Sequence, residues 1–138
     1  MSVDADRVRA RLVAMTALLD HLDALGEVTA TRLEEDFAIR LQVERVLSQV
    51  VTLATEINTH VVSREAGRAP SDLRSSFGDL AAVGWIDRSL ATELRGSSGL
   101  RNVLVHEYVD VDLDVVALAV PLALDAYRRF IRQVAAKL

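Results

Sequence analysis

The stretch GLRNVLVHEY at 99–108 carries four side chains suited to phosphate chemistry. They are Arg101, Asn102, His106 and Tyr108, and most of the residues between them are aliphatic. A histidine with a pKa near neutrality can take a proton from one oxygen and return it to another. An arginine can hold a phosphate and stabilise the extra charge of a pentacoordinate intermediate. With Asn102 to orient the substrate, this group suits cleavage of RNA by its own 2′-hydroxyl, which requires no metal ion.

These four side chains do not share one face of an ideal helix. Asn102 and His106 are four residues apart and share a face, whereas Arg101 and Tyr108 are seven apart and share another. His106 lies about 140° round the helix from Arg101. They can act together if the arginine wraps round, if the helix is distorted near Gly99, or if a second subunit completes the site. A purely structural role also stays open, because an arginine and a histidine at this spacing occur by chance.

Three aspartates that follow the stretch have the spacing with which a calcium loop begins. They are Asp110, Asp112 and Asp114. Such a loop needs glycine at its sixth position and glutamate at its twelfth, where this chain has Val115 and Pro121. Carboxylates at the start of a helix explain the same residues, because they interact favourably with the helix dipole. We therefore expect a helix start here and no calcium site.

Few other reactive groups occur in the chain. There is no cysteine, so neither a disulfide nor a thiolate is available, and a reducing intracellular compartment is expected. The histidines His21, His60 and His106 lie far apart and have no carboxylate at helical ligand spacing, which argues against zinc. The chain has no glycine-rich phosphate loop and no serine nucleophile elbow. We expect neither a metal ion nor a cofactor.

Length and composition indicate one soluble, cytoplasmic domain over 1–138. A chain of 138 residues can bury a core without disulfides, and 51% of it is apolar with few aromatic residues. The longest uncharged apolar run, at 115–124, has ten residues, whereas a membrane span needs roughly 20. The net charge of −4 argues against a general nucleic-acid coat, so any nucleic acid must meet a local basic patch.

The first half of the chain predicts two amphipathic helices. Apolar residues recur at three and four over 4–25, and Gly26 closes that helix. A second helix is expected to start at Thr31, with Glu34 completing a capping box, and to continue without glycine or proline to Ser63. A helix of this length must bury its apolar stripe in a bundle or coiled coil.

Shorter elements are expected in the second half. A loop at 64–70 precedes a short helix that Ser71 or Asp72 caps, that is broken or softened around Gly78 and that stops at Gly84, and a further helix starts near Asp87. The glycines of GSSG at 96–99 either kink that helix or end it, in which case one of the two serines caps its continuation. The last helix runs from Asp112 to the C-terminus. No strand pattern occurs, so we expect an all-α, antiparallel up-and-down bundle of four to five helices.

The stretch GLRNVLVHEYVDVD resembles the HepT-like branch of the HEPN superfamily. The signature of that branch is Arg-polar-x-x-x-His, followed here by x-Tyr. The likeness covers essentially the whole chain, including the helix order, the acidic turn after the motif and a closing helix that contains Pro121. It implies a homodimer of HEPN-like bundles with the motif at the subunit interface, and possible assembly into a larger complex with a partner.

The resemblance also implies a function and a role for each motif residue. The chain would be the toxin of a type VII-like HEPN/MNT toxin–antitoxin system, a metal-independent RNA endonuclease that leaves a cyclic phosphate. Arg101 and His106 would be catalytic, and Asn102 would assist them. Its partner would be a minimal nucleotidyltransferase (MNT) antitoxin that attaches AMP to Tyr108. The added phosphate would repel RNA or occupy the arginines meant for it.

Two other classes of function remain open. In the first, the chain is a catalytically inactive HEPN-like dimer that binds a nucleotidyltransferase partner, and the arginine and histidine hold the dimer together. In the second, it is a purely structural helical protein. Four further arginines could extend a phosphate-binding surface, although each also fits a solvated helix position: Arg95, Arg128, Arg129 and Arg132.

Overall fold

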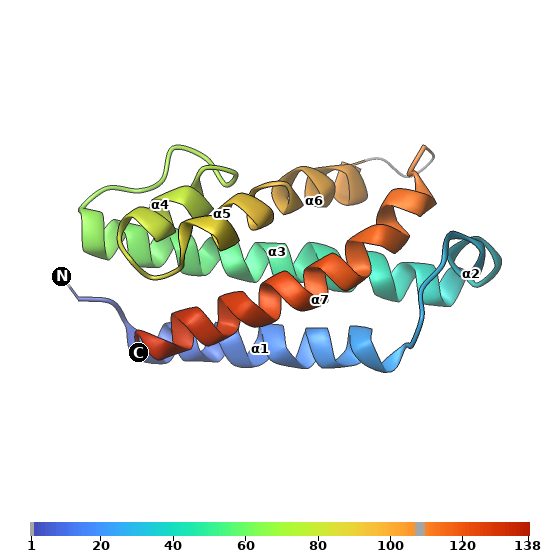
Figure 1. The fold of residues 1–138 in the computed structure, drawn as a ribbon, viewed down its shortest axis with the longest axis horizontal. Helices are drawn as coiled ribbons and strands as arrows, with labels where there is room; N and C mark the ends of the chain where they lie inside the picture. The colour runs from blue at the N-terminus through green and yellow to red at the C-terminus, as the bar shows by residue number, and fades with distance from the viewer. Residues whose placement is uncertain (1, 107–109) are drawn as a thin grey trace.

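The elements are all α-helices in the computed structural model, which describes residues 2–106 and 110–138 (Figure 1). In chain order they are α1 (Ala5–Ala24), α2 (Ala30–Glu35), α3 (Phe37–Ala66), α4 (Ser76–Ala82), α5 (Arg88–Arg95), α6 (Ser97–His106) and α7 (Leu113–Ala136). The predicted helix over 4–25 and the predicted last helix, with its internal proline, are both confirmed.

Four columns of helix run alternately up and down. The long helices α1, α3 and α7 form three of them, α5 and α6 follow one another along the fourth, and the short α4 packs beside α5 (Figure 1). The helix α3 lies against α1, α4, α6 and α7, so it is the centre of the bundle. This arrangement confirms the predicted all-α, antiparallel bundle. The described residues contain seven helices rather than four or five, because two of the predicted helices are divided.

The first division lies at Asp36. The backbone of Asp36 is extended, with φ −120° and ψ 96°, so it ends α2 and starts α3. Its carboxylate accepts a hydrogen bond from the backbone N–H of Ile39, which makes it the N-cap of α3. The prediction of one helix from Thr31 is therefore wrong, since an aspartate can satisfy a helix start better than a helix interior.

The start of α2 also differs from the prediction. Thr29, not Thr31, is its N-cap, and the Thr29 hydroxyl accepts a hydrogen bond from the backbone N–H of Arg32. The capping box of Thr31 with Glu34 is accordingly wrong. At its C-terminal end α3 extends beyond Ser63, where the helix was expected to end, and finishes at Ala66. The next residue, Gly67, takes a left-handed conformation with φ +71°.

The helix α4 starts later than predicted. Asp72 caps a turn, because its carboxylate accepts from the backbone N–H of Ser75 at 2.7 Å, and α4 begins only at Ser76. The helix then continues through Gly78 without a break. Gly84, with φ +86°, allows the turn towards α5.

A single residue, Gly96, separates α5 from α6 and has helical dihedral angles. The hydroxyls of Ser97 and Ser98 donate to the carbonyl oxygens of Leu94 and Arg95, at 2.6 and 3.2 Å. Both serines thus complete the end of α5, and the column continues almost directly into α6. The GSSG sequence left two alternatives open, and this arrangement is closer to a kink in one helix than to a helix end followed by a second helix that a serine caps.

An aromatic cluster ties α4 to α7. The rings of Phe77 and Tyr127 each meet Phe130 edge-on, with centroids 6.2 Å apart in both pairs. Tyr127 is only 2% exposed, and its hydroxyl is hydrogen-bonded to the hydroxyl of Ser97. Burial raises the pKa of Tyr127 well above its usual range. Because the Ser97 hydroxyl donates its proton to a carbonyl oxygen, the Tyr127 hydroxyl is the donor in the bond between the two. This hydrogen bond fixes the first turn of α6 on α7.

Candidate active site

The helix α6 carries three of the four predicted site residues, Arg101, Asn102 and His106. It packs on α3, and its buried Leu104 belongs to the core. Asn102 is exposed. His106 is the last residue of α6, its side chain lies outside the described part of the structure, and Tyr108 lies outside the described residues.

Arg101 is held by a hydroxyl group of α3. Its Nε donates to Oγ1 of Thr52 at 2.8 Å, and the guanidinium is half-buried. The Thr52 hydroxyl in turn donates to the carbonyl oxygen of Ser48 at 3.0 Å, so its lone pairs face the arginine. Among the described residues, Thr52 is the only hydrogen-bond partner of the Arg101 side chain, and no carboxylate forms an ion pair with it. The guanidinium is therefore oriented by a neutral group and keeps its charge for an anion.

The helix is continuous through Gly99, so no distortion there brings Arg101 and His106 to one face. Along the axis the two residues are about 7.5 Å apart, and they remain about 140° apart round it. Two of the three arrangements considered from the sequence remain, namely an arginine that wraps round the helix or a second subunit that completes the site.

Thr52 is a site residue that the sequence does not reveal. It lies 49 positions before Arg101, within a run of apolar residues in α3. Threonine in such a helix commonly bonds back to the carbonyl four residues earlier, which Thr52 also does. Only the packing of α6 on α3 gives its hydroxyl a second role.

Replacing Thr52 by valine should lower kcat about tenfold for the RNA cleavage that the motif implies, because the lost hydrogen bond leaves Arg101 less well oriented. The shape of the side chain is nearly kept, so the fold should persist, as circular dichroism would check. Thr16→Val is the matched control, since Thr16 is also half-buried and bonds back to Leu12 at 2.8 Å in α1. A Thr52→Val variant with wild-type kcat would contradict this role.

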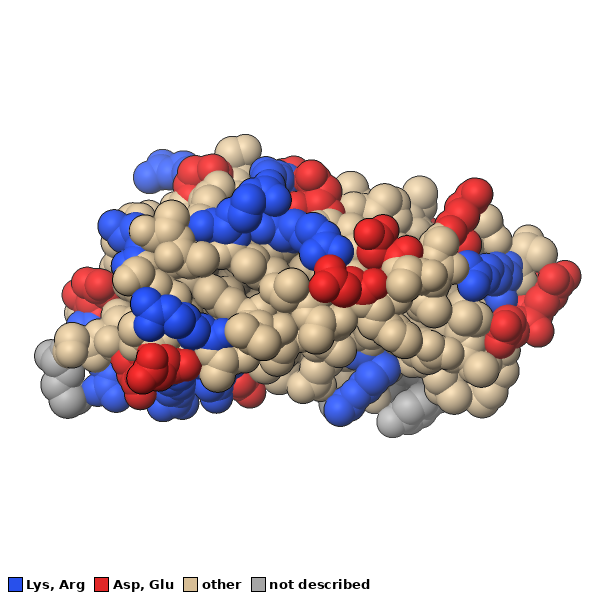
Figure 2. Space-filling model, turned by 90° about the horizontal axis from the view of Figure 1, so that it is seen from below, with Lys and Arg blue, Asp and Glu red and all other residues tan. Residues whose placement is uncertain are grey.

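Two of the four arginines considered as a phosphate surface are already paired. Arg128 and Arg129 of α7 each contact two carboxylates, at distances of 2.6 to 3.9 Å. The partners are Asp20 and Asp23 for the first and Glu93 and Asp125 for the second. Figure 2 shows basic and acidic side chains interleaved on the face seen from below in the first view. These two arginines fit the solvated-surface interpretation better than a phosphate site.

Within 2–106 and 110–138, no group of three histidine or acidic side chains could hold a metal ion. The same part of the chain has no helix long and apolar enough to cross a membrane.

Comparison with known proteins confirms the family resemblance. A family model described as ribonuclease HepT-like matches residues 15–134. A tRNA nuclease HepT of Aphanizomenon flos-aquae is 32% identical over 128 residues, which cover 92% of this chain and 86% of that protein. An mRNA nuclease HepT of Shewanella oneidensis is 29% identical over 101 residues, or 73% of this chain and 76% of that one.

Solved structures share the same fold. A tri-AMPylated Shewanella oneidensis HEPN toxin in complex with MNT antitoxin superposes with a TM-score of 0.83 at 24% identity, covering 95% of this chain and 98% of that one. The toxin–antitoxin structure of a mutant MntA–HpeT pair gives a TM-score of 0.81 at 25% identity, with the same coverage. The family match spans most of the chain and includes the helix that holds Arg101. The chain therefore belongs to the ribonuclease HepT-like family.

Proposed function

We propose that this chain is a metal-independent endoribonuclease that acts in the cytoplasm as the toxin of a HEPN/MNT toxin–antitoxin pair. The observation that carries the proposal is Arg101, a cation without a carboxylate partner among the described residues, on a helix that ends at His106. The relatives support the substrate class, since two are named tRNA and mRNA nucleases. The partner is supported by the solved toxin that carries AMP and is bound to an MNT antitoxin.

In this reaction the RNA supplies the nucleophile. The 2′-oxygen forms a bond to the neighbouring phosphorus as the bond from phosphorus to the 5′-oxygen breaks, which leaves a 2′,3′-cyclic phosphate and a 5′-hydroxyl. His106 accepts the proton of the 2′-hydroxyl, and a protonated His106, from the same or a second subunit, returns a proton to the leaving 5′-oxygen. Arg101 binds the non-bridging oxygens, whose negative charge grows in the intermediate. Asn102, exposed beside Arg101, orients the nucleotide.

A second copy of the chain is proposed to complete the site. Arg101 and His106 occupy positions about 140° apart round a continuous helix, which a two-fold axis can compensate by presenting each residue twice. Near α6, the side chains of Val115, Leu118 and Leu122 in α7 are 50%, 67% and 69% exposed. With Leu100 they line a groove of about 500 Å³ between α6 and α7. Exposed apolar patches of this kind typically mark an interface between proteins.

Replacing Leu118 by glutamate should convert the proposed dimer to a monomer, because a charge would then line the apolar groove. Since Leu118 is 67% exposed, the monomer itself should stay folded. Sedimentation velocity would measure the change, and RNA cleavage should be lost with the dimer. Val13→Glu is the control, because Val13 in α1 is 70% exposed and lies outside the groove. If Leu118→Glu stays dimeric, the groove between α6 and α7 is not the interface.

The direct test of the proposed function is RNA cleavage by the purified protein in EDTA. The expected result is fragments that end in a 2′,3′-cyclic phosphate, together with growth arrest when the chain is produced in cells. If a broad range of RNAs stays intact with and without added metal ions, the ribonuclease proposal fails. The alternative would then be the catalytically inactive module that binds a nucleotidyltransferase, provided that the two proteins co-purify.

A further inference from the structure

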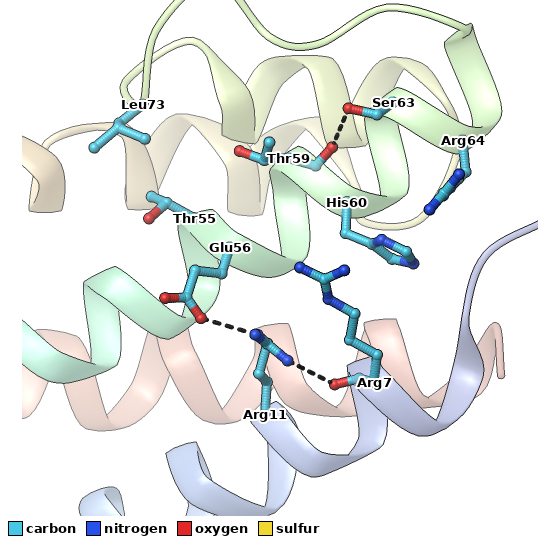
Figure 3. Close-up of a pocket in the computed structure, with 9 residues that line it drawn as sticks. All are labelled: Arg7, Arg11, Thr55, Glu56, Thr59, His60, Ser63, Arg64 and Leu73. Atoms are coloured by element: carbon cyan, nitrogen blue, oxygen red, sulfur yellow. Dashed lines mark hydrogen bonds and ion pairs between the residues drawn. The ribbon is translucent and has the colours of Figure 1, made fainter.

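A second concentration of positive charge lies in a pocket between α1 and α3, apart from α6. The pocket has a volume of about 460 Å³. Arg7 and Arg11 reach it from α1, and His60 and Arg64 come from the last turns of α3 (Figure 3). We call this the α1–α3 pocket. None of these residues belongs to the motif, and the proposed cleavage step does not use them.

His60 contributes a neutral donor to the α1–α3 pocket. Its Nε2 accepts a hydrogen bond from the backbone N–H of Asp4 at 2.9 Å, so that nitrogen carries no proton. Burial lowers the pKa of His60, and the nearby charges of Arg7 and Arg64 lower it further. The ring is therefore neutral with its proton on Nδ1, and the positive charge of the pocket resides on the arginines.

The arginines of the pocket differ in how they are bound. Nε of Arg11 contacts Oε2 of Glu56 at 2.9 Å, and its Nη1 donates to the carbonyl oxygen of Arg7 at 3.3 Å. Arg11 thus offsets the carboxylate and braces α1 against α3. The guanidinium of Arg7 is exposed and has no hydrogen-bond or ion-pair partner among the described residues. Figure 3 shows it pointing into the space below His60. The pocket keeps a net positive charge.

The α1–α3 pocket shares one face of α3 with the residue that holds Arg101. Glu56, Thr59 and Ser63, which line the pocket, follow Thr52 by four, seven and eleven residues and lie within about 40° of it round the helix. From Thr52 to Thr59 the distance along the axis is about 10 Å. One helix face therefore leads from the candidate cleavage site to the pocket, and the acidic group on it, Glu56, is offset by Arg11.

We propose that the α1–α3 pocket binds a backbone phosphate of the RNA substrate, a few nucleotides from the bond cleaved beside Arg101. This inference rests on the proposed ribonuclease function. Proteins that hold single strands combine a basic groove along the backbone with donors to the phosphates, and arginine is well suited to that contact. A chain of net charge −4 needs such a local site. The paired Arg128 and Arg129 do not supply it.

The test measures binding of the full chain to a labelled single-stranded 2′-O-methyl RNA, which has no 2′-hydroxyl to attack its own backbone. Fluorescence anisotropy at several salt concentrations gives the affinity and its salt slope. Arg7→Gln and Arg64→Gln should each weaken binding about fivefold, the usual loss for one hydrogen-bonded contact. Each should also reduce the slope of log affinity against log salt by about 0.7, the value for one phosphate contact on a single strand.

Arg9→Gln is the matched control, because Arg9 is also an exposed arginine of α1 but faces away from the pocket, where it contacts Asp6 at 3.5 Å. Its affinity and slope should equal those of the wild type. The inference is overturned if the two pocket variants bind like Arg9→Gln, or if the wild type does not bind the RNA at all. Circular dichroism verifies that each variant is folded.

The binding experiment also separates this inference from the proposed function. If the wild type cleaves natural RNA and the pocket variants bind RNA normally, the proposed ribonuclease function stands and the proposed role of the α1–α3 pocket is rejected. If the wild type never cleaves RNA but the pocket variants lose affinity and salt slope, the α1–α3 pocket binds RNA and the protein is not a nuclease.

Discussion

Replacing Arg101 or His106 by alanine is expected to abolish RNA cleavage, with a loss of kcat of at least about a thousandfold for each. Arg101→Ala removes the cation that we propose stabilises the charged intermediate. His106→Ala removes the group that we propose moves the proton. Initial rates of RNA cleavage in EDTA measure both effects, and a shared loss of similar size is expected if the two residues act in one step. Asn102→Ala, which affects orientation alone, should lose much less.

Matched control variants test whether the loss of activity comes from a general loss of charge or of folding. Arg88 is an exposed arginine at the start of α5, and His21 is an exposed histidine of α1 that contacts Gln42 at 2.8 Å. Arg88→Ala and His21→Ala should retain full activity. The proposed dimer should persist in both motif variants. If instead Arg101→Ala or His106→Ala dissociates the dimer while RNA is untouched even by the wild type, the two residues hold the subunits together and are not catalytic.

Production of the chain together with an MNT nucleotidyltransferase should switch off RNA cleavage through AMP on Tyr108. The tyrosine oxygen would form a bond to the α-phosphorus of ATP and release pyrophosphate. The attached phosphodiester places negative charge beside the motif, where it repels RNA and competes for Arg101. Intact mass spectrometry should show one or more added AMP groups, and Tyr108→Phe should remain an active nuclease in the presence of the partner.

The sequence contains only one other tyrosine, Tyr127, and its position in the structure makes it a control for modification at Tyr108. Tyr127 is 2% exposed and its hydroxyl is bonded to Ser97 in the core, so a transferase cannot reach it in the folded chain. Tyr127→Phe should therefore still be modified. AMP found on Tyr127, on a serine or on a threonine would show that the assignment of Tyr108 is wrong.

Long, strongly periodic helices were predictable from the sequence, whereas their interruptions were not. The helix over 4–25 ends within one residue of α1, because one apolar stripe spans it and a glycine follows. The break at Asp36 was missed because the apolar spacing from Leu33 to Phe37 continues across it. Only the extended backbone and the side-chain cap of Asp36 reveal the break. Local polarity alone does not distinguish a cap from a solvated position.

The candidate site shows the same limit at longer range. A short motif identifies Arg101, Asn102 and His106, because catalytic residue types at a fixed spacing are a local property. The contact of Arg101 with Thr52 joins residues 49 positions apart and depends on how α6 packs on α3. The salt bridges of Arg128 and Arg129 likewise depend on neighbouring helices. Tertiary packing, which no local pattern encodes, decides which arginines are free to bind phosphate.

The buried hydrogen bond between Tyr127 and Ser97 has a mechanical consequence for the motif helix. It fixes the first turn of α6, while the buried Leu104 and the hydrogen bond from Arg101 to Thr52 hold the helix further along, so the tilt of α6 is set at several points. A helix about 15 Å long that tilts by roughly 4° moves its last residue by about 1 Å, and a displacement of that size at a reacting group can cost a hundredfold in rate. We therefore expect the accuracy of the proposed cleavage step to depend in part on a pair of hydroxyls inside the core, at the opposite end of α6 from His106.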